Sequence, residues 1–385
     1  MNDSMGIKFN EAVWHDTVYM HPQLRKEVGP DFFDRTQLKT MLKAALRDKN
    51  SSLLIFQGER RAGKSSLLRL LQHNLAHDPA QTFLPLFVPW QTIFSRADLA
   101  DEILRSSSYE LDVDLSDEMI EDSIASDAGF VATLQELTAV SGKTIVICID
   151  EFDSILEHGT DAEQAQILAL VDAVAQAEKL PVKFLLTLVR LPACPADHAM
   201  AQVTVHRLAP FSQDDLNEMV SELMAWRAHL LTPDVRAELF RLSGGWPYFA
   251  KLLMVCLAEA EPGEGWFERA LQTAVAHPLL EHSLSHIYFR HFNEAEKAVV
   301  LFLAARGMPL SAAEWDVLPS AWQTAVFKLV QRHYLTVDNT GGYQFCIGLL
   351  ADWFPQWIRY EEEVQAHIDP KGLSDDMLNY LKVNP

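Results

Sequence analysis

The sequence predicts an α/β protein in which helices cover both faces of a parallel sheet, followed by a helical region and a short hairpin. Three observations predict this fold. Apolar runs of strand length alternate with helical patterns from about residue 50 to residue 207. Residues 212–282 show only helical patterns, and two strand-like runs flank a glycine-containing turn near residue 340. Uninterrupted apolar strands are typical of the buried interior of a parallel sheet.

The first predicted elements surround a glycine-containing loop. From Leu38 to Ala45, apolar residues recur at positions i, i+3, i+4 and i+7, which is the spacing of one helix face. Residues 52–56 form a short apolar strand that leads into a loop beginning at Gly58. The leucine-rich residues 67–71 predict a helix after the loop. We therefore expect a strand, a loop and a helix in direct succession.

Three more apolar runs predict further strands of the sheet. They span residues 83–88, 144–149 and 184–189. Residues 111–127, between the first two runs, carry seven acids and no base. A run of one charge sign is usually a solvated face, so we expect a helical insertion there rather than an acidic partner site.

The last part of the chain predicts helices followed by a hairpin. Ser212 with Asp215 three residues later is a capping pattern that marks the start of a helix. Residues 334–337 and 343–345 are strand-like, and Asp-Asn-Thr-Gly-Gly between them is a turn sequence. Two or three helices precede this hairpin, which is the layout of a winged helix.

The composition limits the classes of partner. The 385 residues include 32 Lys and Arg against 53 Asp and Glu, a formal net charge of −21. Such a surface disfavours broad binding to DNA, RNA or anionic membranes, because phosphate affinity needs clustered positive charge. No apolar run approaches the ~20 residues that span a bilayer, and the first residues do not resemble a signal peptide. The scattered cysteines, without a Cys-x-x-Cys pair, favour reduced thiols in the cytoplasm.

Residues 58–65, Gly-Glu-Arg-Arg-Ala-Gly-Lys-Ser, fit the pattern G-x-x-x-x-G-K-[ST] between a predicted strand and a predicted helix. Glycines let several backbone N–H groups converge on a triphosphate, and the helix start adds its positive dipole end. Lys64 would contact the β- and γ-phosphates, and the Ser65 hydroxyl would bind Mg²⁺. The sequence therefore predicts a P-loop that binds ATP and Mg²⁺. The expected nucleotide-binding residues of this loop are Gly58, Arg60, Arg61, Ala62, Gly63, Lys64, Ser65 and Ser66. Arg60 and Arg61 are at variable loop positions, where they could instead reach a neighbouring subunit or an acidic face.

Two acids, Asp150 and Glu151, follow the apolar run 144–149 directly. An acid at the end of a buried strand is the expected second half of a P-loop site. Asp150 would hold the Mg²⁺ shell, and Glu151 would polarise the attacking water as a general base. The adjacent pair favours hydrolysis of ATP over nucleotide storage, so we expect an ATPase that is slow or stimulated by a partner.

The order of these motifs resembles that of the STAND ATPases, AAA+-related P-loop NTPases that include archaeal-type ATPases. The resemblance covers about residues 30–355. Residues 58–68 resemble the G-x-R-R-x-G-K-[ST]-S-L-L loop of that family, residues 149–153 its Walker B segment, and residues 243–248 its G-G-x-P-Y motif. Residues 31–35 resemble its F-x-G-R element, with aspartate in place of the glycine.

The resemblance implies roles for Arg35 and Pro247, and the residues themselves indicate roles for Thr187 and Arg190. Arg35 would lie near the adenine, and the helix that Pro247 begins would face the nucleotide. Arg190 would sense the γ-phosphate or act across a subunit interface; otherwise it forms a salt bridge at the strand end. Thr187, on a strand expected beside the P-loop, would orient water or contact the γ-phosphate; otherwise it is a buried strand former. The expected catalytic residues are thus Lys64, Glu151, Thr187 and Arg190.

The motifs and the resemblance together divide the chain into five segments. We expect an N-terminal arm (1–30), a P-loop ATPase core of the AAA+ type with a parallel sheet (31–210), a helical lid (211–283), a winged-helix domain (284–361) and a C-terminal tail (362–385).

Three functions fit this organisation. The first is a STAND-like switch that changes domain orientation or assembly with ATP or ADP and signals, in bacterial defence or signalling, through a separately encoded partner protein, with homo-oligomers expected. The second is a DNA-dependent loader or transposition regulator that uses its winged helix on DNA. The third is a scaffold that binds ATP without turnover. The net charge of −21 favours the first function over the second.

Overall fold

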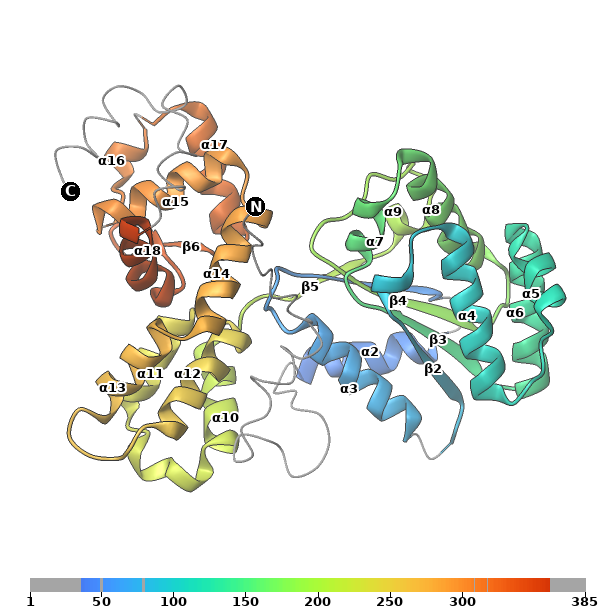
Figure 1. Ribbon diagram of the computed structural model, residues 1–385, viewed down its shortest axis with the longest axis horizontal. Coiled ribbons are helices and arrows are strands. Elements are labelled where there is room, and N and C mark those ends of the chain that lie inside the picture. Colours follow the sequence, from blue (N-terminus) through green and yellow to red (C-terminus); the bar gives the residue numbers. More distant parts are fainter. Residues whose placement is uncertain (1–35, 49–50, 78–79, 308, 317, 361–385) are drawn as a thin grey trace, which may run out of the picture. The chain divides into compact units, whose positions relative to one another are not determined.

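The computed structural model describes residues 36–360 except 49–50, 78–79, 308 and 317 (Figure 1). The chain divides into two compact units at the Ala209–Pro210 bond. The predicted arm, the predicted tail and Arg35 lie outside the described residues.

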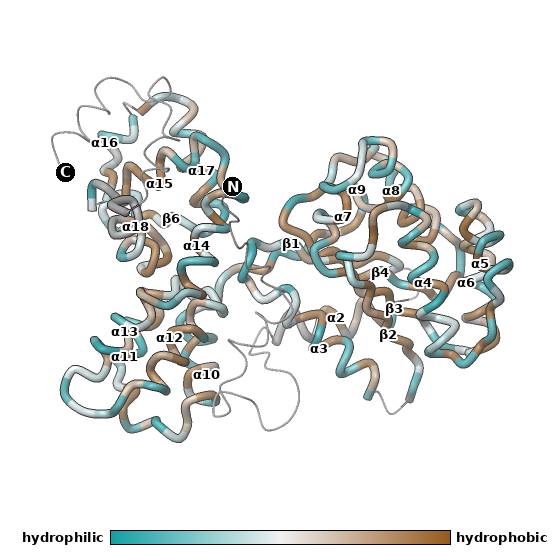
Figure 2. The backbone as a smooth tube through the Cα atoms, in the orientation of Figure 1, coloured by the Kyte–Doolittle hydropathy of each residue, from teal (hydrophilic) through white to brown (hydrophobic). Residues whose placement is uncertain are grey.

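A five-stranded parallel sheet forms the centre of the first unit, with strand order β2-β3-β4-β1-β5. The strands are β1 (Leu53–Gln57), β2 (Phe83–Val88), β3 (Thr144–Ile149), β4 (Val182–Leu188) and β5 (Val205–Arg207). The apolar runs in the sequence thus form strands, and the predicted parallel sheet is confirmed. Every residue of β4 is buried, as expected for a strand inside a sheet that is covered on both faces. Figure 2 shows the inner strands as hydrophobic along their length.

Helices pack on both faces of this sheet (Figure 1). Side chains of β1 alternate between two apolar clusters, because successive residues of a strand point to opposite faces. One cluster contains residues of α2 and α3, and the other contains residues of α4, α6, α7 and α8. The helices of this unit are α2 (Thr36–Arg47), α3 (Lys64–Ala76), α4 (Arg96–Leu111), α5 (Asp117–Ile124), α6 (Asp127–Ser141), α7 (Phe152–His158), α8 (Asp161–Gln176) and α9 (Ala199–Gln202), with a 3₁₀ turn, η2 (Trp90–Thr92).

Strand β2 is an edge of the sheet and contains a proline. Thr144 donates its N–H to the carbonyl oxygen of Thr82 at 2.9 Å, so residues 82, 84 and 86 direct their polar groups toward β3. The backbone of Pro85 therefore faces the open edge. A missing N–H costs no ladder hydrogen bond at that position, and it interrupts the row of donors that an edge strand would otherwise present.

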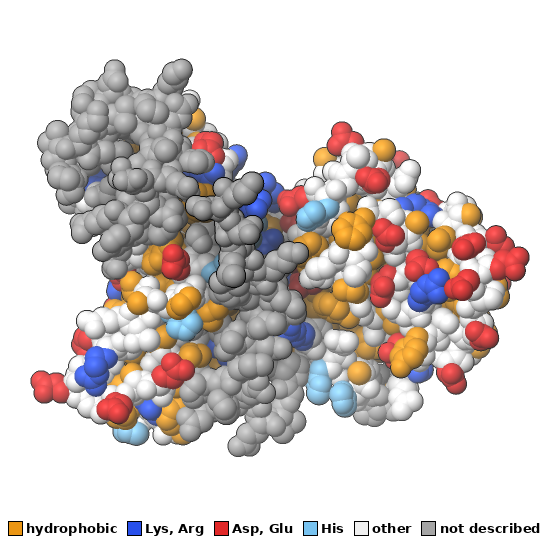
Figure 3. All heavy atoms as spheres, in the orientation of Figure 1, with side chains coloured by type: hydrophobic (Ala, Val, Ile, Leu, Met, Phe, Trp, Pro, Cys, Tyr) orange, Lys and Arg blue, Asp and Glu red, His pale blue; other side chains and the backbone are white. Residues whose placement is uncertain are grey.

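The acid-rich residues 111–127 form helix α5 and its flanking turns. Ser116 caps the helix by accepting the N–H of Met119, and Ile120 is buried against the unit. The four acids of α5 are exposed, and Figure 3 shows acidic side chains gathered around this helix. The prediction of a solvated helix here is confirmed.

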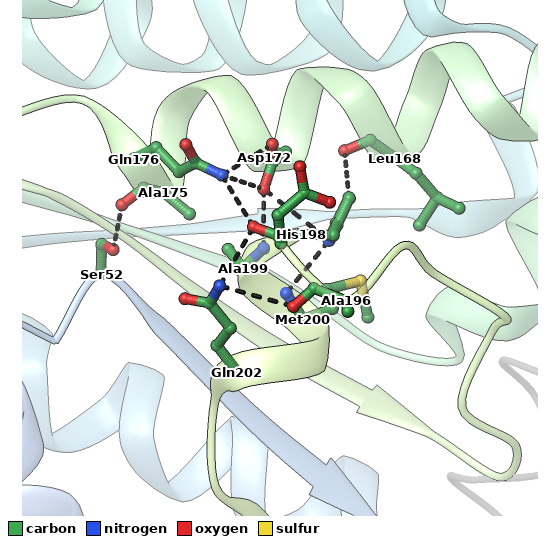
Figure 4. A network of polar contacts seen from close by, with 11 residues as sticks. Ser52, Leu168, Asp172, Ala175, Gln176, Ala196, His198, Ala199, Met200 and Gln202 are labelled. Carbon is green, nitrogen blue, oxygen red and sulfur yellow. Dashed lines mark hydrogen bonds and ion pairs between the residues drawn. The ribbon is translucent and has the colours of Figure 1, made fainter.

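A polar network fixes the connection between β4 and β5 onto α8 (Figure 4). The ring of His198, which caps α9, lies 3.0 Å through Nε2 from the carbonyl oxygen of Leu168 and accepts the N–H of Met200 through Nδ1 at 3.1 Å. Because Nδ1 accepts, the hydrogen of the neutral ring is on Nε2. Asp172 accepts the N–H of Ala199 at 2.7 Å, so the connection is held at two points of one helix.

The described residues of the second unit are helical apart from one hairpin. Its elements are α10 (Gln213–Leu223), a 3₁₀ helix η3 (Ala225–Leu230), α11 (Pro233–Ser243), α12 (Pro247–Glu259), α13 (Trp266–Val275), α14 (Pro278–His291), α15 (Glu294–Arg306), α16 (Ala312–Trp315), α17 (Ser320–Gln331), β6 (Leu335–Val337), β7 (Tyr343–Phe345) and α18 (Gly348–Tyr360). The predicted capping box is present, because Ser212 and Asp215 each accept the other's N–H. The described helices include none with the length and apolar character that crossing a membrane requires.

The end of this unit has the layout of a winged helix. Helices α15 and α17 precede the antiparallel pair β6–β7. Leu310 forms an isolated bridge to Tyr343 through two backbone hydrogen bonds of 2.8 and 2.9 Å. The predicted boundary between lid and winged helix, at residues 283–284, falls inside α14. After Pro278, that segment contains neither glycine nor proline before Asn293, so nothing local interrupts the helix.

Candidate nucleotide-binding site

The loop between β1 and α3 has the backbone that a phosphate site requires. Arg61 and Gly63 have positive φ angles of 70° and 92°, which turns successive N–H groups toward one point. Gly58 donates its N–H to the carbonyl oxygen of Leu188 at 3.0 Å. A Cβ atom on Gly58 would lie 3.0 Å from Cβ of Leu208, so only glycine fits there without displacement. Close packing against β4 and β5 therefore fixes the loop.

Helix α3 begins without a side-chain cap. Its N-cap residue is Gly63, and its first turn contains no acid. By contrast, Ser95, Ser116, Ser126 and Thr160 each accept an N–H at the start of a neighbouring helix. The N–H groups at the start of α3 are thus not capped by a side chain of the helix itself. These N–H groups and the positive end of the helix dipole suit the binding of a phosphate group. Ser65 and Ser66 lie in this first turn and are half-buried.

Lys64 is buried, with 5% of its surface exposed. Its Nζ donates to the carbonyl oxygens of Gly58 and Glu59 at 2.9 and 3.1 Å, so the side chain folds back over the loop. Burial lowers the pKa of Lys64, and the negative charges of Asp150 and Glu151 oppose that shift. Burial removes the water that would stabilise the charged ammonium group of Lys64. A bound polyphosphate would stabilise that charge instead.

Two acids follow β3 and contact the neighbouring strand. Thr187 on β4 donates its hydroxyl hydrogen to Oδ1 of Asp150 and accepts the N–H of Glu151 at 3.1 Å. Glu151 has φ 50° and ψ 46°, in the left-handed region that favours glycine. Strand β4 lies between β1 and β3, so Thr187 is placed between the loop and the acids.

The loop and the acids meet through an ion pair. Nη1 of Arg60 lies 3.4 Å from Oε1 of Glu151. The charges of Asp150, Glu151 and Asp153 also act on Lys64. The structure therefore brings together Arg60, Lys64, Asp150, Glu151 and Thr187, as the sequence predicted for the two halves of one site.

Asp153 is a site residue for which the sequence analysis gave no role. From the first turn of α7, its Oδ2 accepts the N–H groups of Val189 and Arg190 at 2.9 and 3.1 Å. This contact ties the end of β4 to the helix after Glu151. Its position four residues after the strand, in an acid-rich Asp-Glu-Phe-Asp segment, was the available signal. The side chain of Arg190 is exposed.

Pro247 belongs to the second unit, where it is the first residue of α12, as predicted. The glycines before it permit close backbone contacts. A Cβ on Gly245 would lie 2.2 Å from the carbonyl oxygen of Phe211, and one on Gly244 would lie 2.6 Å from that of Cys346. Trp246 is fully buried and stacks on Tyr334 with ring centroids 5.3 Å apart. The Gly-Gly-Trp-Pro segment thus joins the start of the unit to its winged helix.

The donor atoms of the candidate site fit Mg²⁺. Ser65 contributes a hydroxyl and Asp150 a carboxylate, which are the hard oxygen ligands that Mg²⁺ prefers alongside phosphate and water. Asp150 is already oriented by the hydroxyl of Thr187. The hollow of about 370 Å³ beside β2, lined in part by Phe87, Arg105 and Tyr109, contains none of the predicted site residues.

The fold resembles those of known ATPases. No protein-family model matches the sequence, and no curated protein matches it. Among solved structures, the Walker-type ATPase PABY2304 of Pyrococcus abyssi is 18% identical with a TM-score of 0.59, and the match covers 87% of this chain and 98% of that chain. The ORC2 protein of Aeropyrum pernix, solved as ADPNP–ADP complexes, is 12% identical with a TM-score of 0.57, covering 91% and 98%. The chain therefore has the fold of an AAA+-type P-loop ATPase with a helical C-terminal region.

Proposed function

We propose that the protein is an ATP-hydrolysing switch of the STAND type that signals through a partner protein. The observation that carries the proposal is the contact between the two halves of the site, with Arg60 of the loop 3.4 Å from Glu151. A P-loop after β1 and an Asp-Glu pair after β3, on either side of β4, have the parts needed for phosphoryl transfer to water.

In the proposed binding step, the N–H groups around Gly63 and the ammonium group of Lys64 hold the phosphates of ATP. Arg60, Arg61, Ala62 and Ser66 line the same loop. Ser65 and Asp150 would hold Mg²⁺, which when bound neutralises phosphate charge. Arg35 would contact the adenine and Pro247 the closed nucleotide site, as the STAND resemblance implies.

In the proposed chemical step, Glu151 accepts the proton of the attacking water as general base. Support comes from Thr187, which orients Asp150 and the backbone of Glu151. The left-handed backbone of Glu151 also supports a specialised role, because strained residues held by several contacts cluster at functional sites. Arg190 would sense the γ-phosphate from the end of β4, in the same chain or across an interface between copies.

The output of the switch would be a change in domain orientation or assembly in the cytoplasm. ATP can shift such an equilibrium only by binding one arrangement more tightly than the other. We propose that the second unit supplies this differential contact through the helix that Pro247 begins. Phe327 of α17 and Val337 of β6 are exposed apolar side chains of the winged helix, and we propose that a protein partner covers them.

The alternative, a DNA-dependent ATPase, has less support at the winged helix. Arg332, one of the few bases near α17, donates to Glu296 at 3.1 Å and to the carbonyl oxygen of His291 at 3.2 Å. Its guanidinium also lies 5.2 Å from the ring centroid of Tyr334, and its side chain is 18% exposed. Lys328 is exposed. Measurable binding to duplex DNA at low salt, weakening as salt rises, would favour this alternative.

Phosphate release measured with Mg²⁺ and ATP tests the proposed function. We expect turnover in the wild-type protein, and loss of turnover with retained ATP binding in Glu151→Gln. Lys64→Ala should lose ATP binding itself. A wild-type protein that binds ATP but releases no phosphate, alone or with candidate partners, would instead be a nucleotide-binding scaffold.

A further inference from the structure

Arg60 belongs to the P-loop, but its side chain reaches the acid that follows β3. Its Nη1 and Oε1 of Glu151 are 3.4 Å apart, and the two side chains are 20% and 19% exposed. A partly buried pair is screened less by salt and water than a surface pair. The loop thus places a permanent positive charge on the carboxylate that we propose as general base.

The backbone of Glu151 has little freedom to reposition this carboxylate. Its φ and ψ angles of 50° and 46° are in the left-handed region, and its N–H donates to Thr187 and to Asp150. A non-glycine residue stays in that region only when surrounding contacts hold it there. The side-chain torsions of Glu151 therefore determine where the carboxylate lies, and the contact with Arg60 restrains them.

Lys64, another cation of the same loop, makes different contacts. Its Nζ donates to the carbonyl oxygens of Gly58 and Glu59 and is buried beneath the loop. Lys64 thus holds the backbone of the loop, whereas Arg60 holds Glu151.

We propose that Arg60 is a positioning residue that restrains Glu151 in the nucleotide-free protein. When ATP binds, the guanidinium of Arg60 leaves Glu151 and binds the γ-phosphate instead. This inference rests on the proposed ATPase function. A guanidinium can bind phosphate through two parallel N–H bonds, and a γ-phosphate carries more charge than one carboxylate. The exchange breaks one ion pair and forms another, so the base is released only when the terminal phosphate has arrived. ADP, which lacks that phosphate, leaves the pair intact.

A thermodynamic cycle on nucleotide affinity tests the exchange. The four proteins are wild type, Arg60→Ala, Glu151→Gln and the double variant, titrated with a fluorescent non-hydrolysable ATP analogue and with fluorescent ADP. Glu151→Gln removes the carboxylate that competes with the γ-phosphate for Arg60, so it should tighten binding of the ATP analogue. We expect this gain in affinity to be about fivefold larger in the protein that has Arg60 than in the Arg60→Ala protein. For ADP, the effect of Glu151→Gln should be the same in both backgrounds.

Arg61 provides a matched control, because it is the adjacent arginine of the same loop. In an Arg61→Ala background, Glu151→Gln should tighten binding of the ATP analogue as much as in wild type. Arg60→Lys should keep part of the coupling, since a lysine retains the charge without the fork.

The outcomes separate this inference from the proposed function. If wild type binds neither nucleotide, the proposed function fails. If nucleotides bind but Glu151→Gln has the same effect on the ATP analogue with and without Arg60, the exchange is wrong. An Arg60-dependent effect of equal size for ADP would also overturn it, because the γ-phosphate would then have no part. If Arg60→Ala does not fold, Arg60→Gln in the same cycle gives the same decision.

Discussion

Thr187 is the residue that links the two acids of the candidate site, and its hydroxyl makes both contacts. Thr187→Val keeps the shape of the side chain but leaves a carboxylate and an N–H without this partner. We expect kcat for ATP hydrolysis to fall about 10- to 100-fold, because an unmet buried polar group costs about 1–3 kcal/mol. ATP affinity should change less than about threefold, since the phosphate contacts of the loop remain.

Phosphate release and titration with a labelled ATP analogue measure the two quantities separately. Thr187→Ser keeps the hydroxyl and is the matched control, expected to retain most of the activity. An unchanged kcat in the valine variant would show that Thr187 is only a buried strand residue.

Cys256 gives a residue-scale test of burial in the second unit. Burial raises the pKa of its thiol to about 12. Only the thiolate reacts with disulfide reagents. The raised pKa by itself leaves about one thiol in 10⁴ deprotonated at pH 8. We expect Cys256 to stay unlabelled at pH 8 in the folded protein and to react after unfolding in denaturant. Peptide mass spectrometry measures the labelling, and rapid reaction of Cys256 in the folded protein would contradict its burial.

The residues of the candidate site were predictable where the chemistry is local. The loop from Gly58 to Ser65 and the pair Asp150 and Glu151 each form a contiguous pattern beside an apolar strand. The ion pair between Arg60 and Glu151 was not predictable, because it joins residues far apart in the chain. It depends on strand order and on the left-handed turns at Arg61 and Glu151, for which no glycine signal is present.

At the scale of elements, the glycines before α12 determine how the second unit closes on itself. Gly245 has φ 74°, and an added Cβ would lie 2.2 Å from the backbone of Phe211. Gly307 has a similar φ of 67° but open space around it. We expect Gly307→Ala to lower the free energy of unfolding by about 1 kcal/mol, the cost of the left-handed backbone alone. Gly245→Ala should cost more than about 3 kcal/mol, because the overlap adds to it.

Urea unfolding followed by tryptophan fluorescence reports this comparison directly, since Trp246 is fully buried beside Gly245. Equal losses in the two variants would mean that the contact with Phe211 is not tight. Close backbone packing is a sufficient physical reason for the two glycines of the G-G-x-P-Y motif.

Helix α14 runs through the boundary that the sequence predicts within the second unit. A change from helical to helix-and-hairpin patterns suggested a division near residue 284, but a helix can run through such a change. Tertiary packing, not local composition, decides whether adjacent segments share a core. A hinge at this boundary would have to interrupt α14.

At the scale of the whole molecule, ATP should stabilise the native state. A ligand that binds only the folded protein adds about 2.7 kcal/mol at a free concentration 100 times its Kd. We expect a rise in Tm with ATP and Mg²⁺ that grows with the logarithm of ATP concentration. Lys64→Ala should abolish the rise while leaving a folded protein. Thermal unfolding followed by circular dichroism measures both, and a nucleotide-independent Tm in the wild type would count against binding.

The fold class was predictable because apolar runs and helical periods alternate along the first unit. The strand order was not, since β4 inserts between β1 and β3 only through long-range pairing that local patterns do not encode. That insertion places Thr187 beside both halves of the site. The overall class therefore follows from periodicity, whereas the geometry of the site follows from topology.

Pro85 also constrains how copies of this protein can associate. The open side of β2 has no donor at its middle, and the opposite border of the sheet is the three-residue β5. Copies that pair strand to strand at a sheet edge can grow into fibrils. Pro85 therefore obstructs such pairing at β2, and β5 is too short to offer more than a few hydrogen bonds. Among the described residues of the first unit, helices and loops therefore remain as surfaces through which copies could associate, and such contacts can separate again when the nucleotide changes.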